Sequence, residues 1–308
     1  MSANAVAHSA PPDRSLPRWR LWWLAARPKT LPAAIAPVIA GSAVAFHERG
    51  FHLPTALVAL MTALLLQIAA NFANDALDFK RGTDTAERTG PMRVTASGLI
   101  TADDVLRATW ITLALAMVSG LYLVWRGGWP FLLLGVAALV CAVAYTGGPF
   151  PISYLGLGEI FVFLFFGPIA VAGTAYVQTH HLTALALAVS VPIGVLAIGI
   201  LIVNNLRDLP TDAKAGKRTV AVRIGARNTH YEYAAMLIVA AVSPIVFWLV
   251  GWLNWSWLLT VGAWPALWSL WKQITTRSGP ALNPTLGNTG KTLLLVSVLL
   301  SAALVLSR

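Results

Sequence analysis

Residues 53–84 read LPTALVALMTALLLQIAANFANDALDFKRGTD, an apolar run that could cross a membrane and that ends in asparagine and aspartate. A second apolar run, residues 184–205, ends in the same way and continues as NNLRDLPTD over residues 204–212. The chain has only 12 acidic residues in 308, and five of them lie in these two clusters. A carboxylate where a membrane helix meets water costs free energy unless a partner compensates it, so both clusters are predicted to bind something positively charged.

The composition predicts an all-α, polytopic membrane protein. Hydrophobic residues make up 57% of the chain, charged residues only 11%, and the mean hydropathy is +0.70. Soluble domains carry about 25% charged residues. A bilayer crossing needs about 20 apolar residues, and about nine runs approach that length: residues 30–47, 53–74, 105–125, 129–146, 158–177, 184–205, 231–250, 252–271 and 291–307. We expect a disordered cytoplasmic tail over residues 1–20 and a single transmembrane domain over residues 21–308.

The basic residues predict the orientation of these helices. With a cytoplasmic amino terminus, 19 of the 22 lysine and arginine residues fall on the cytoplasmic side. The opposite side then holds Arg49, Arg126 and Arg308. This asymmetry is what the positive-inside rule predicts, and it places both Asn/Asp clusters at the cytoplasmic face of the cell inner membrane. The net charge of +10 is explained by topology and by attraction to anionic membrane lipid, and calls for no nucleic acid.

The spacing within each cluster predicts a cation site. Asn71, Asp75 and Asp78 follow an i, i+4, i+7 pattern, which puts them on one face of a helix. Asn204 and Asp208 follow the same pattern, but Pro210 interrupts it, so Asp212 is expected to project from a turn. Carboxylates stacked on one face repel one another unless a cation separates them. Magnesium suits such a site, because it takes oxygen ligands from one or two carboxylates together with substrate phosphates.

Other polar residues are candidates for binding a diphosphate. The basic candidates are Arg27, Lys29, Lys80, Arg93, Arg207 and Lys217, since charge-assisted contacts to phosphate are strong. Each of these basic residues could instead serve only to orient the helices in the membrane. Asn71, Asn74, Asp84, Asn204 and Asn205 complete the polar set. The alternative for the acidic clusters is that they are helix-end and turn formers in wet loops. That alternative fits Asp103 and Asp104, which follow Thr101 as a helix cap and are left out of the site.

A third segment, YTGGPFPISYLGLGE over residues 145–159, is too rich in proline and glycine to be helical. Tyr145 and Tyr154 could stabilise a cationic intermediate with their aromatic faces. Glu159 is open to two interpretations, as a site residue or as an acid favoured at a helix amino terminus. Two long polar loops, residues 75–104 and 206–230, follow the two clusters. Within them, residues 80–98 and 210–217 are expected to close over the bound diphosphate, the alternative being that they are packed caps or flexible connectors.

These motifs resemble a known family. Asn74-Asp75-x-x-Asp78 with Asp84, and Asn205-x-x-Asp208-x-x-x-Asp212, resemble the two aspartate-rich motifs of the intramembrane aromatic prenyltransferases of the UbiA superfamily. The resemblance covers essentially the whole chain. Residues 27–32, 90–100 and 145–159 are similar to the branch that acts on 1,4-dihydroxy-2-naphthoate. The branch that acts on 4-hydroxybenzoate has a tighter first motif, whose last aspartate would fall at position 82, a glycine in this chain.

The resemblance implies a UbiA-type helical bundle and a reaction. A polyprenyl group would pass from polyprenyl diphosphate to 1,4-dihydroxy-2-naphthoate, with loss of carbon dioxide and diphosphate, to give demethylmenaquinone. It also implies that Asp75, Asp78, Asp208 and Asp212 are catalytic and bind Mg²⁺. Two alternatives stay open, another aromatic acceptor such as 4-hydroxybenzoate and an ion-coupled transporter. A transporter would carry its acidic residues near the membrane midplane, whereas these cluster at one surface.

Overall fold

The computed structural model describes residues 16–82, 90–149 and 151–308, and the regular structure in these ranges is helical. The first elements are α1 (Arg18–Ala25), η1 (Pro28–Thr30), α2 (Pro32–His47), α3 (Leu53–Lys80), α4 (Ala102–Gly127), α5 (Trp129–Ala144) and η2 (Ile152–Tyr154). They are followed by α6 (Gly158–Leu164), η3 (Phe165–Ala172), α7 (Gly173–Thr179), α8 (Ala184–Arg207), α9 (Leu209–Lys214) and α10 (Val220–Leu249). The chain ends with η4 (Trp255–Ala263), α11 (Trp264–Thr276), η5 (Gly279–Leu282) and α12 (Asn283–Leu306). The predicted all-α fold is confirmed.

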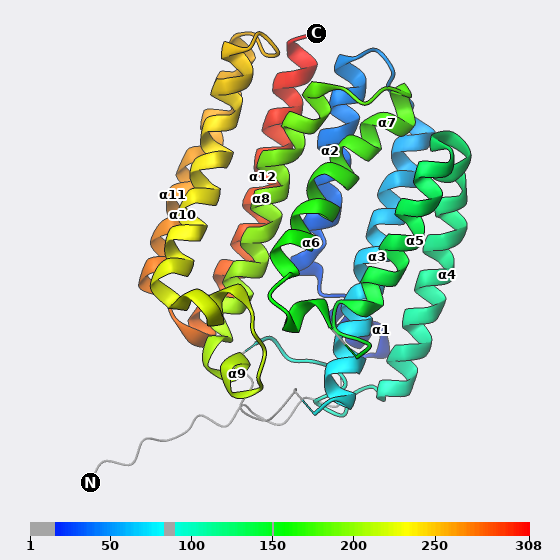
Figure 1. The fold of residues 1–308 in the computed structure, drawn as a ribbon, viewed down its shortest axis with the longest axis vertical. Coiled ribbons are helices and arrows are strands. Elements are labelled where there is room, and N and C mark those ends of the chain that lie inside the picture. Colours follow the sequence, from blue (N-terminus) through cyan, green and yellow to red (C-terminus); the bar gives the residue numbers. More distant parts are fainter. Residues whose placement is uncertain (1–15, 83–89, 150) are drawn as a thin grey trace.

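The long helices run side by side and alternate in direction (Figure 1). The short helices α1 and α9 lie at one end of this bundle, and the carboxyl terminus lies at the other. The predicted tail over residues 1–20 falls mostly outside the described residues, and α1 begins within it at Arg18. Both aspartate clusters therefore sit at the end of the bundle that also carries α1 and α9.

Six helices in the described ranges are long and apolar enough to cross a membrane, or seven if the bent pair Arg18–Thr30 and Pro32–His47 is one span. The six include α3, α4, α8, α10, the continuous run α6–η3–α7 and the run from η5 through α12. Helix α5, with 16 residues, is apolar but shorter, and η4 with α11 does not meet the criterion. A multi-pass membrane protein is thus supported, while the count of about nine crossings stays a prediction.

Several helix boundaries differ from the predicted ones. Helix α3 continues to Lys80, six residues beyond the predicted end at residue 74, so Asn71, Asn74, Asp75 and Asp78 lie on the helix itself. Helix α10 begins at Val220 rather than at residue 231. Its first turns were predicted as loop because they are polar, but they bury Ala221 and Thr229, and Gly225 supplies a kink with φ of 77°.

The core lies where α8 and α12 pass through the centre of the bundle. Small residues let the helices approach closely: a Cβ on Gly167 of η3 would lie 3.0 Å from the Ser190 carbonyl oxygen of α8. Buried hydroxyls add hydrogen bonds between helices, as between Tyr233 and Thr289 at 2.7 Å. Such bonds contribute about 0.6 kcal/mol each inside membrane proteins. The close packing of small residues therefore stabilises the association of the helices more than these hydrogen bonds do.

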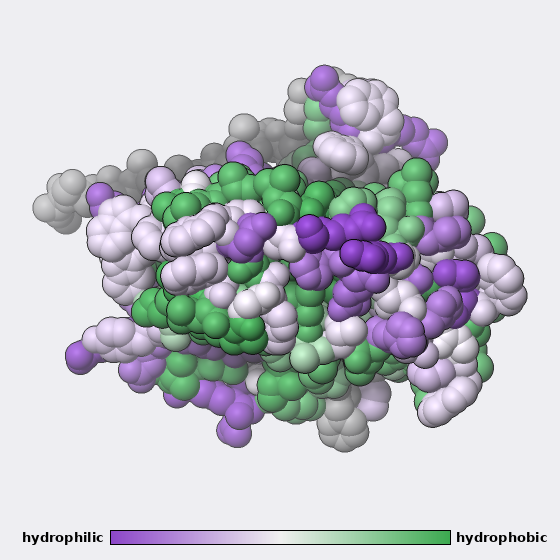
Figure 2. Space-filling view, turned by 90° about the horizontal axis from the view of Figure 1, so that it is seen from above, coloured by the Kyte–Doolittle hydropathy of each residue, from purple (hydrophilic) through white to green (hydrophobic). Residues whose placement is uncertain are grey.

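The outer helices face outward with apolar side chains, as a lipid environment requires. Helix α4 exposes Ile111, Leu115, Val118 and Leu121 along one side. Figure 2 views the end that carries the carboxyl terminus, where hydrophilic side chains gather in patches between hydrophobic ones. Polar surface is thus confined to restricted areas at this end.

Candidate active site

At the end of α3, the carboxylates of Asp75 and Asp78 have different partners. Asp78 is buried and forms an ion pair with Arg93, with 2.8 Å between Oδ2 and Nη1. Arg93 also donates to the backbone oxygen of Asn74 at 2.5 Å. Asp75, 1% exposed, accepts hydrogen bonds from the backbone N–H groups of Val94 and Thr95 and from the Thr95 hydroxyl. The Asp75 carboxylate therefore anchors the following loop.

The end of α8 is organised around Arg207, which is 1% exposed. Its guanidinium donates to both carboxylate oxygens of Asp208, at 2.8 and 2.5 Å. It also donates to Asn204 at 2.7 Å and, across to α12, to Asn283 at 3.0 Å. A bidentate arginine–carboxylate pair is rigid in geometry. Arg207 thus fixes Asp208 and Asn204 at the end of α8 and is itself surrounded by protein acceptors.

Asp212 lies on the short helix α9, not in a turn as predicted from Pro210. Pro210 falls in the first turn of α9, where a proline is tolerated because its missing N–H has no helical acceptor there. The helix restarts directly after Asp208, and the Asp212 N–H donates to the Asp208 carbonyl at 2.8 Å. Burial raises the pKa of Asp212 to about 6, while Lys217, 3.6 Å away, acts to lower it. A cation in the pocket would favour the ionised form of this carboxylate further.

The segment between α5 and α6 forms the remaining wall. The Thr146 hydroxyl donates to the Asn74 side chain at 2.8 Å, which ties the segment to α3. The Arg218 N–H donates to the Tyr154 carbonyl at 3.0 Å, which ties it to the chain after α9. Gly156 has φ of 70°, and a Cβ there would lie 2.6 Å from the Arg218 oxygen, so this close approach requires glycine. The segment thereby bridges the two aspartate-bearing ends.

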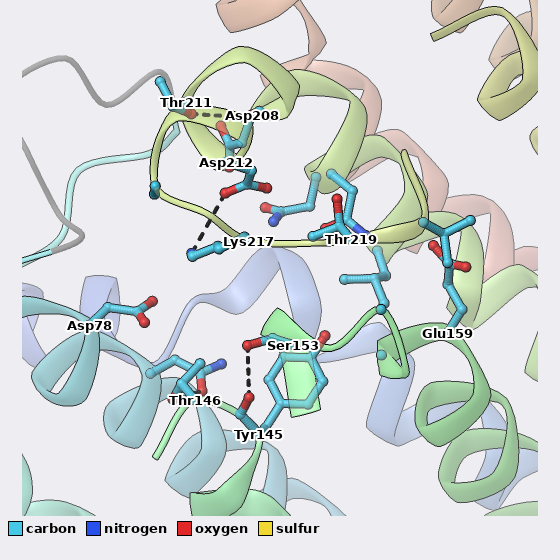
Figure 3. Close-up of a pocket in the computed structure, with 18 of the residues that line it drawn as sticks. Asp78, Tyr145, Thr146, Ser153, Glu159, Asp208, Thr211, Asp212, Lys217 and Thr219 are labelled. Carbon is cyan, nitrogen blue, oxygen red and sulfur yellow. Dashed lines mark hydrogen bonds and ion pairs between the residues drawn. The ribbon is translucent and has the colours of Figure 1, made fainter. Parts of the chain in front are cut away.

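These elements enclose a polar pocket of about 120 Å³. Figure 3 shows Asp78 on one side of it and Asp208, Asp212 and Lys217 on the other. Its other polar lining residues include Arg27, Asn74, Arg93, Tyr145, Thr146, Ser153, Glu159, Asn204, Asn205, Thr211 and Thr219. Carboxylates from α3 and from the α8–α9 junction thus face one cavity, as the sequence predicts.

A second and larger cavity, of about 400 Å³, adjoins the polar one. It extends among α2 to α8 and is lined mainly by apolar side chains such as Leu66, Leu134, Phe161 and Ile200. The two cavities share five lining residues: Arg27, Asn74, Tyr145, Leu201 and Asn204. The site therefore combines a charged compartment with an apolar one, and a ligand with a charged head and a long hydrocarbon tail fits both.

Comparison with known proteins identifies the family. The family model described as "UbiA prenyltransferase family" matches residues 34–288. The chain belongs to the UbiA prenyltransferase family.

Among UbiA proteins, the chain is similar to enzymes named 1,4-dihydroxy-2-naphthoate octaprenyltransferase. The enzyme of Mycobacterium tuberculosis is 41% identical, over 92% of this chain and 96% of its own length. That of Escherichia coli is 37% identical, over 96% of this chain and 98% of its own length. That of Haemophilus influenzae is 36% identical, over 93% and 96%.

Two solved UbiA structures share the fold. The apo UbiA homolog from Aeropyrum pernix superposes with a TM-score of 0.66 at 14% identity, covering 89% of this chain and 97% of that one. The homolog from Archaeoglobus fulgidus bound to GPP and Mg²⁺ gives a TM-score of 0.56 at 15% identity, covering 91% and 99%. At such low identity these likenesses concern the fold alone.

Within the UbiA fold, the predicted site residues separate into two groups. Those that line the polar cavity are Arg27, Asn74, Asp78, Arg93, Tyr145, Asn204, Asn205, Asp208, Asp212 and Lys217. Those that do not are Lys29, Asn71, Asp75, Lys80, Tyr154 and Arg207. Asn71 lines the apolar cavity instead, and Asp84 falls outside the described residues.

Lys80 and Tyr154 of the second group have partners elsewhere. Lys80 pairs with Asp103 at 2.8 Å on the exposed surface. The Tyr154 ring lies under two cations, with Lys217 Nζ at 4.9 Å and the Arg81 guanidinium at 5.6 Å from its centroid. This ring is therefore already engaged by protein charges, whereas the Tyr145 ring lies at the junction of the cavities.

Some lining residues were not singled out from the sequence. Thr146, Ser153, Thr211 and Thr219 are hydroxyl residues in loops or at helix ends, where no periodicity marks them. Glu159, left open from the sequence, lines the polar cavity at the start of α6. It also interacts with Asn205 of α8 and with Glu232 of α10.

The donors in the polar cavity fit magnesium held jointly by protein and substrate. In the described ranges, no three acidic, histidine or cysteine side chains lie close enough together to hold a metal ion by themselves. Asp78, Asp208 and Asp212 instead present carboxylates from opposite walls (Figure 3), and Asn74 and Asn204 line the same cavity. Magnesium is typically bound by one or two carboxylates with phosphate oxygens completing its shell, which matches this divided arrangement.

The anchoring role of Asp75 gives a stability prediction. Asp75→Ala leaves the Val94 and Thr95 N–H groups without their charged acceptor inside the protein, and hydrogen bonds to charged groups contribute about 1.5–3 kcal/mol each. We expect the free energy of unfolding in detergent to fall by on the order of 3 kcal/mol, which lowers the melting temperature. The matched control is Asp103→Ala, because its pair with Lys80 is exposed and such pairs contribute little. Equal melting temperatures for the two variants would contradict the anchor.

Proposed function

We propose that this UbiA protein transfers a polyprenyl group from polyprenyl diphosphate to 1,4-dihydroxy-2-naphthoate, with loss of carbon dioxide and diphosphate, and forms demethylmenaquinone. The observation that carries this proposal is the junction of the carboxylate-lined cavity with the apolar one. Relatives named for this reaction are 36–41% identical over nearly the whole chain. The reaction therefore rests on both the geometry and the relatives.

The polar cavity would receive the diphosphate. Asp78 on one wall and Asp208 with Asp212 on the other would hold Mg²⁺ against the diphosphate oxygens. Bound magnesium supplies Lewis-acid stabilisation of the negative charge that develops on the leaving diphosphate. Arg27, Arg93 and Lys217 line the same cavity and would contact the phosphate oxygens directly. In this assignment Asp75 and Arg207 are positioning residues, which hold Asp78 and Asp208 in place.

The apolar cavity would receive the first isoprene units of the substrate. Its walls exclude water from the allylic carbon, which protects a cationic centre from being quenched. Tyr145 lies where the cavities meet, so its ring face would lie beside that centre and favour positive charge. The hydrocarbon chain would thus lie in the apolar cavity and the diphosphate in the polar one. The C–O bond that breaks would lie where the two cavities meet.

The aromatic acceptor would enter on the wall formed by Ser153, Glu159 and Asn205. All three residues line the polar cavity, and Figure 3 shows Glu159 on the side away from Asp78. A dihydroxynaphthoate has two hydroxyls and a carboxylate, so it needs both donors and acceptors. Asn205 can provide a donor, and Glu159 can accept from a ring hydroxyl. The Ser153 hydroxyl donates to the Tyr145 carbonyl at 2.7 Å, so it would act as an acceptor.

We further propose nine membrane crossings within a single domain. Helix α5 and the η4–α11 pair, which are not among the six long apolar helices of the described ranges, run along the bundle beside those helices (Figure 1). An odd number of crossings puts α1 and the carboxyl terminus on opposite sides, as Figure 1 shows for the ends of the bundle. The basic residues favour the site on the cytoplasmic side of the cell inner membrane. An ion-coupled transporter is disfavoured, because the acidic residues lie at one end of the bundle.

The proposed function predicts a product and a metal requirement. Membranes containing the protein, given a labelled polyprenyl diphosphate, Mg²⁺ and equal amounts of naphthoate and 4-hydroxybenzoate acceptors, should yield prenylated naphthoquinol by mass spectrometry. EDTA should abolish the product, and Asp208→Asn should lower turnover by about a hundredfold, since it removes a carboxylate facing the leaving group. Product from the benzoate alone would reassign the acceptor. Wild-type turnover in Asp208→Asn would contradict the site.

The apolar cavity predicts selectivity for chain length. Gly135 lines it, and a Cβ at this position meets no atom within 4 Å, so a larger side chain can enter the cavity without a backbone clash. Gly135→Phe should lower kcat/KM for a long polyprenyl diphosphate by about tenfold, and that for geranyl diphosphate much less. Gly262→Phe on η4, outside both cavities, is the control. Equal losses for both chain lengths would exclude this cavity as the tail site.

A further inference from the structure

Helix α1 carries a surface that the reaction does not use. Its sequence is RWRLWWLA, and its exposed residues include Trp19, Trp23, Arg18 and Arg20. Trp19 and Trp23 are 65% and 54% exposed and stand one helical turn apart, so they share a face. The Arg20 guanidinium lies 5.3 Å from the centroid of the Trp19 ring. Two tryptophans and two arginines are thus exposed on one short helix, and we call the surface that they form the α1 face.

The opposite side of α1 packs against the part of the protein that holds the site. Trp22 meets Phe72 of α3 edge to face, with 5.6 Å between ring centroids. Ala25 and Ala26 share a buried apolar cluster with Phe72, Ala76 and Val94. Val94 belongs to the loop that Asp75 anchors and that carries Arg93. A displacement of α1 would therefore disturb the α3 end of the polar cavity.

The connection from α1 to the site is short and conformationally strained. Arg27 is separated from the end of α1 only by Ala26, and it has φ of 51° and ψ of 68°, the left-handed region that is unfavourable for a side chain with a Cβ. Such a conformation persists only where the surroundings enforce it. Arg27 is also the one basic residue of the described ranges that lines both cavities. Because only Ala26 separates α1 from Arg27, the position of α1 influences the position of the Arg27 guanidinium.

We propose that the α1 face docks on anionic phospholipid at the membrane surface, and that this contact holds Arg27 in place for the diphosphate. The inference rests on the proposed function for its kinetic consequence. Tryptophan favours the membrane–water interface, and arginine is attracted to anionic headgroups. The α1 face lies at the same end of the bundle as the site, where the helices of a multi-pass protein meet the headgroups (Figure 1). Its charge and its aromatic residues match a phospholipid surface.

The consequence is a lipid dependence of unusual sign. Anionic lipid repels an anionic diphosphate substrate, so a surface-charge effect alone raises KM in every variant. Ordering of Arg27 through α1 acts in the opposite direction and lowers KM. A decrease of KM for the prenyl diphosphate on addition of anionic lipid therefore separates the two effects.

The test compares two tryptophan pairs. The full-length protein is reconstituted in nanodiscs of phosphatidylcholine, alone or mixed with phosphatidylglycerol. Trp19→Ser with Trp23→Ser alters the α1 face, and Arg18→Gln with Arg20→Gln tests its charge separately. The matched control is Trp125→Ser with Trp129→Ser, because these residues are 75% and 73% exposed and lie at the opposite end of the bundle. A second readout that needs no turnover is quenching of tryptophan fluorescence by brominated phosphatidylglycerol.

We expect phosphatidylglycerol to lower the wild-type KM for prenyl diphosphate by about fivefold, given two arginines at an anionic surface. Both α1 variants should lose this response, and the control pair should keep it. Brominated lipid should quench the wild type more than the Trp19/Trp23 variant. A wild-type KM that does not fall, or a control pair that loses the response equally, overturns the inference. If no lipid supports prenyl transfer at all, the proposed function fails, and the quenching result alone then decides whether α1 binds anionic lipid.

Discussion

The buried ion pair between Asp78 and Arg93 is the interaction on which the rest of the site depends. Both side chains are less than one-tenth exposed, and an unpaired charge at such a position would be strongly destabilising. Arg93 comes from the loop after α3, so the pair fixes that loop against the helix end. Asp75 secures the same loop through its backbone N–H groups. On the other side of the cavity, Arg207 does the equivalent work for Asp208.

This arrangement explains how a membrane protein keeps several carboxylates close to apolar surroundings. Each carboxylate either has a cationic neighbour, as Asp78, Asp208 and Asp212 do, or accepts backbone hydrogen bonds, as Asp75 does. Burial and the nearby Asp208 raise the pKa of Asp212, although Lys217 and Arg207 act to lower it. A diphosphate with magnesium would bring both the positive charge and the phosphate oxygens that complete the site. Binding of the substrate with magnesium would therefore also compensate the charge of these carboxylates.

Much of this could be predicted from the sequence, because membrane helices and charge asymmetry leave strong signals. The all-α fold and the family followed from apolar runs and from motifs, and they are confirmed. Helical spacing could not distinguish the role of Asp75 from that of Asp78, because both fall within one broad face of α3. The path of the loop after α3 decides which of the two carboxylates it covers. The sequence predicts that Arg207 binds substrate. In the structure its guanidinium donates to Asn283, which lies 76 positions away, and no local sequence pattern reveals this contact. Thr146 and Ser153 were missed for a similar reason, since the path of a proline- and glycine-rich segment has no periodicity.

The central claim is that carboxylates from α3 and from α8–α9 hold the metal–diphosphate together across one cavity. Electron paramagnetic resonance of Mn²⁺, used in place of Mg²⁺, tests this directly with a non-hydrolysable prenyl diphosphate analogue. The account predicts tight Mn²⁺ binding only when the analogue is present, and loss of that binding in Asp78→Asn and in Asp208→Asn alike. Undiminished Mn²⁺ binding in either variant, or tight binding without the diphosphate analogue, would contradict it.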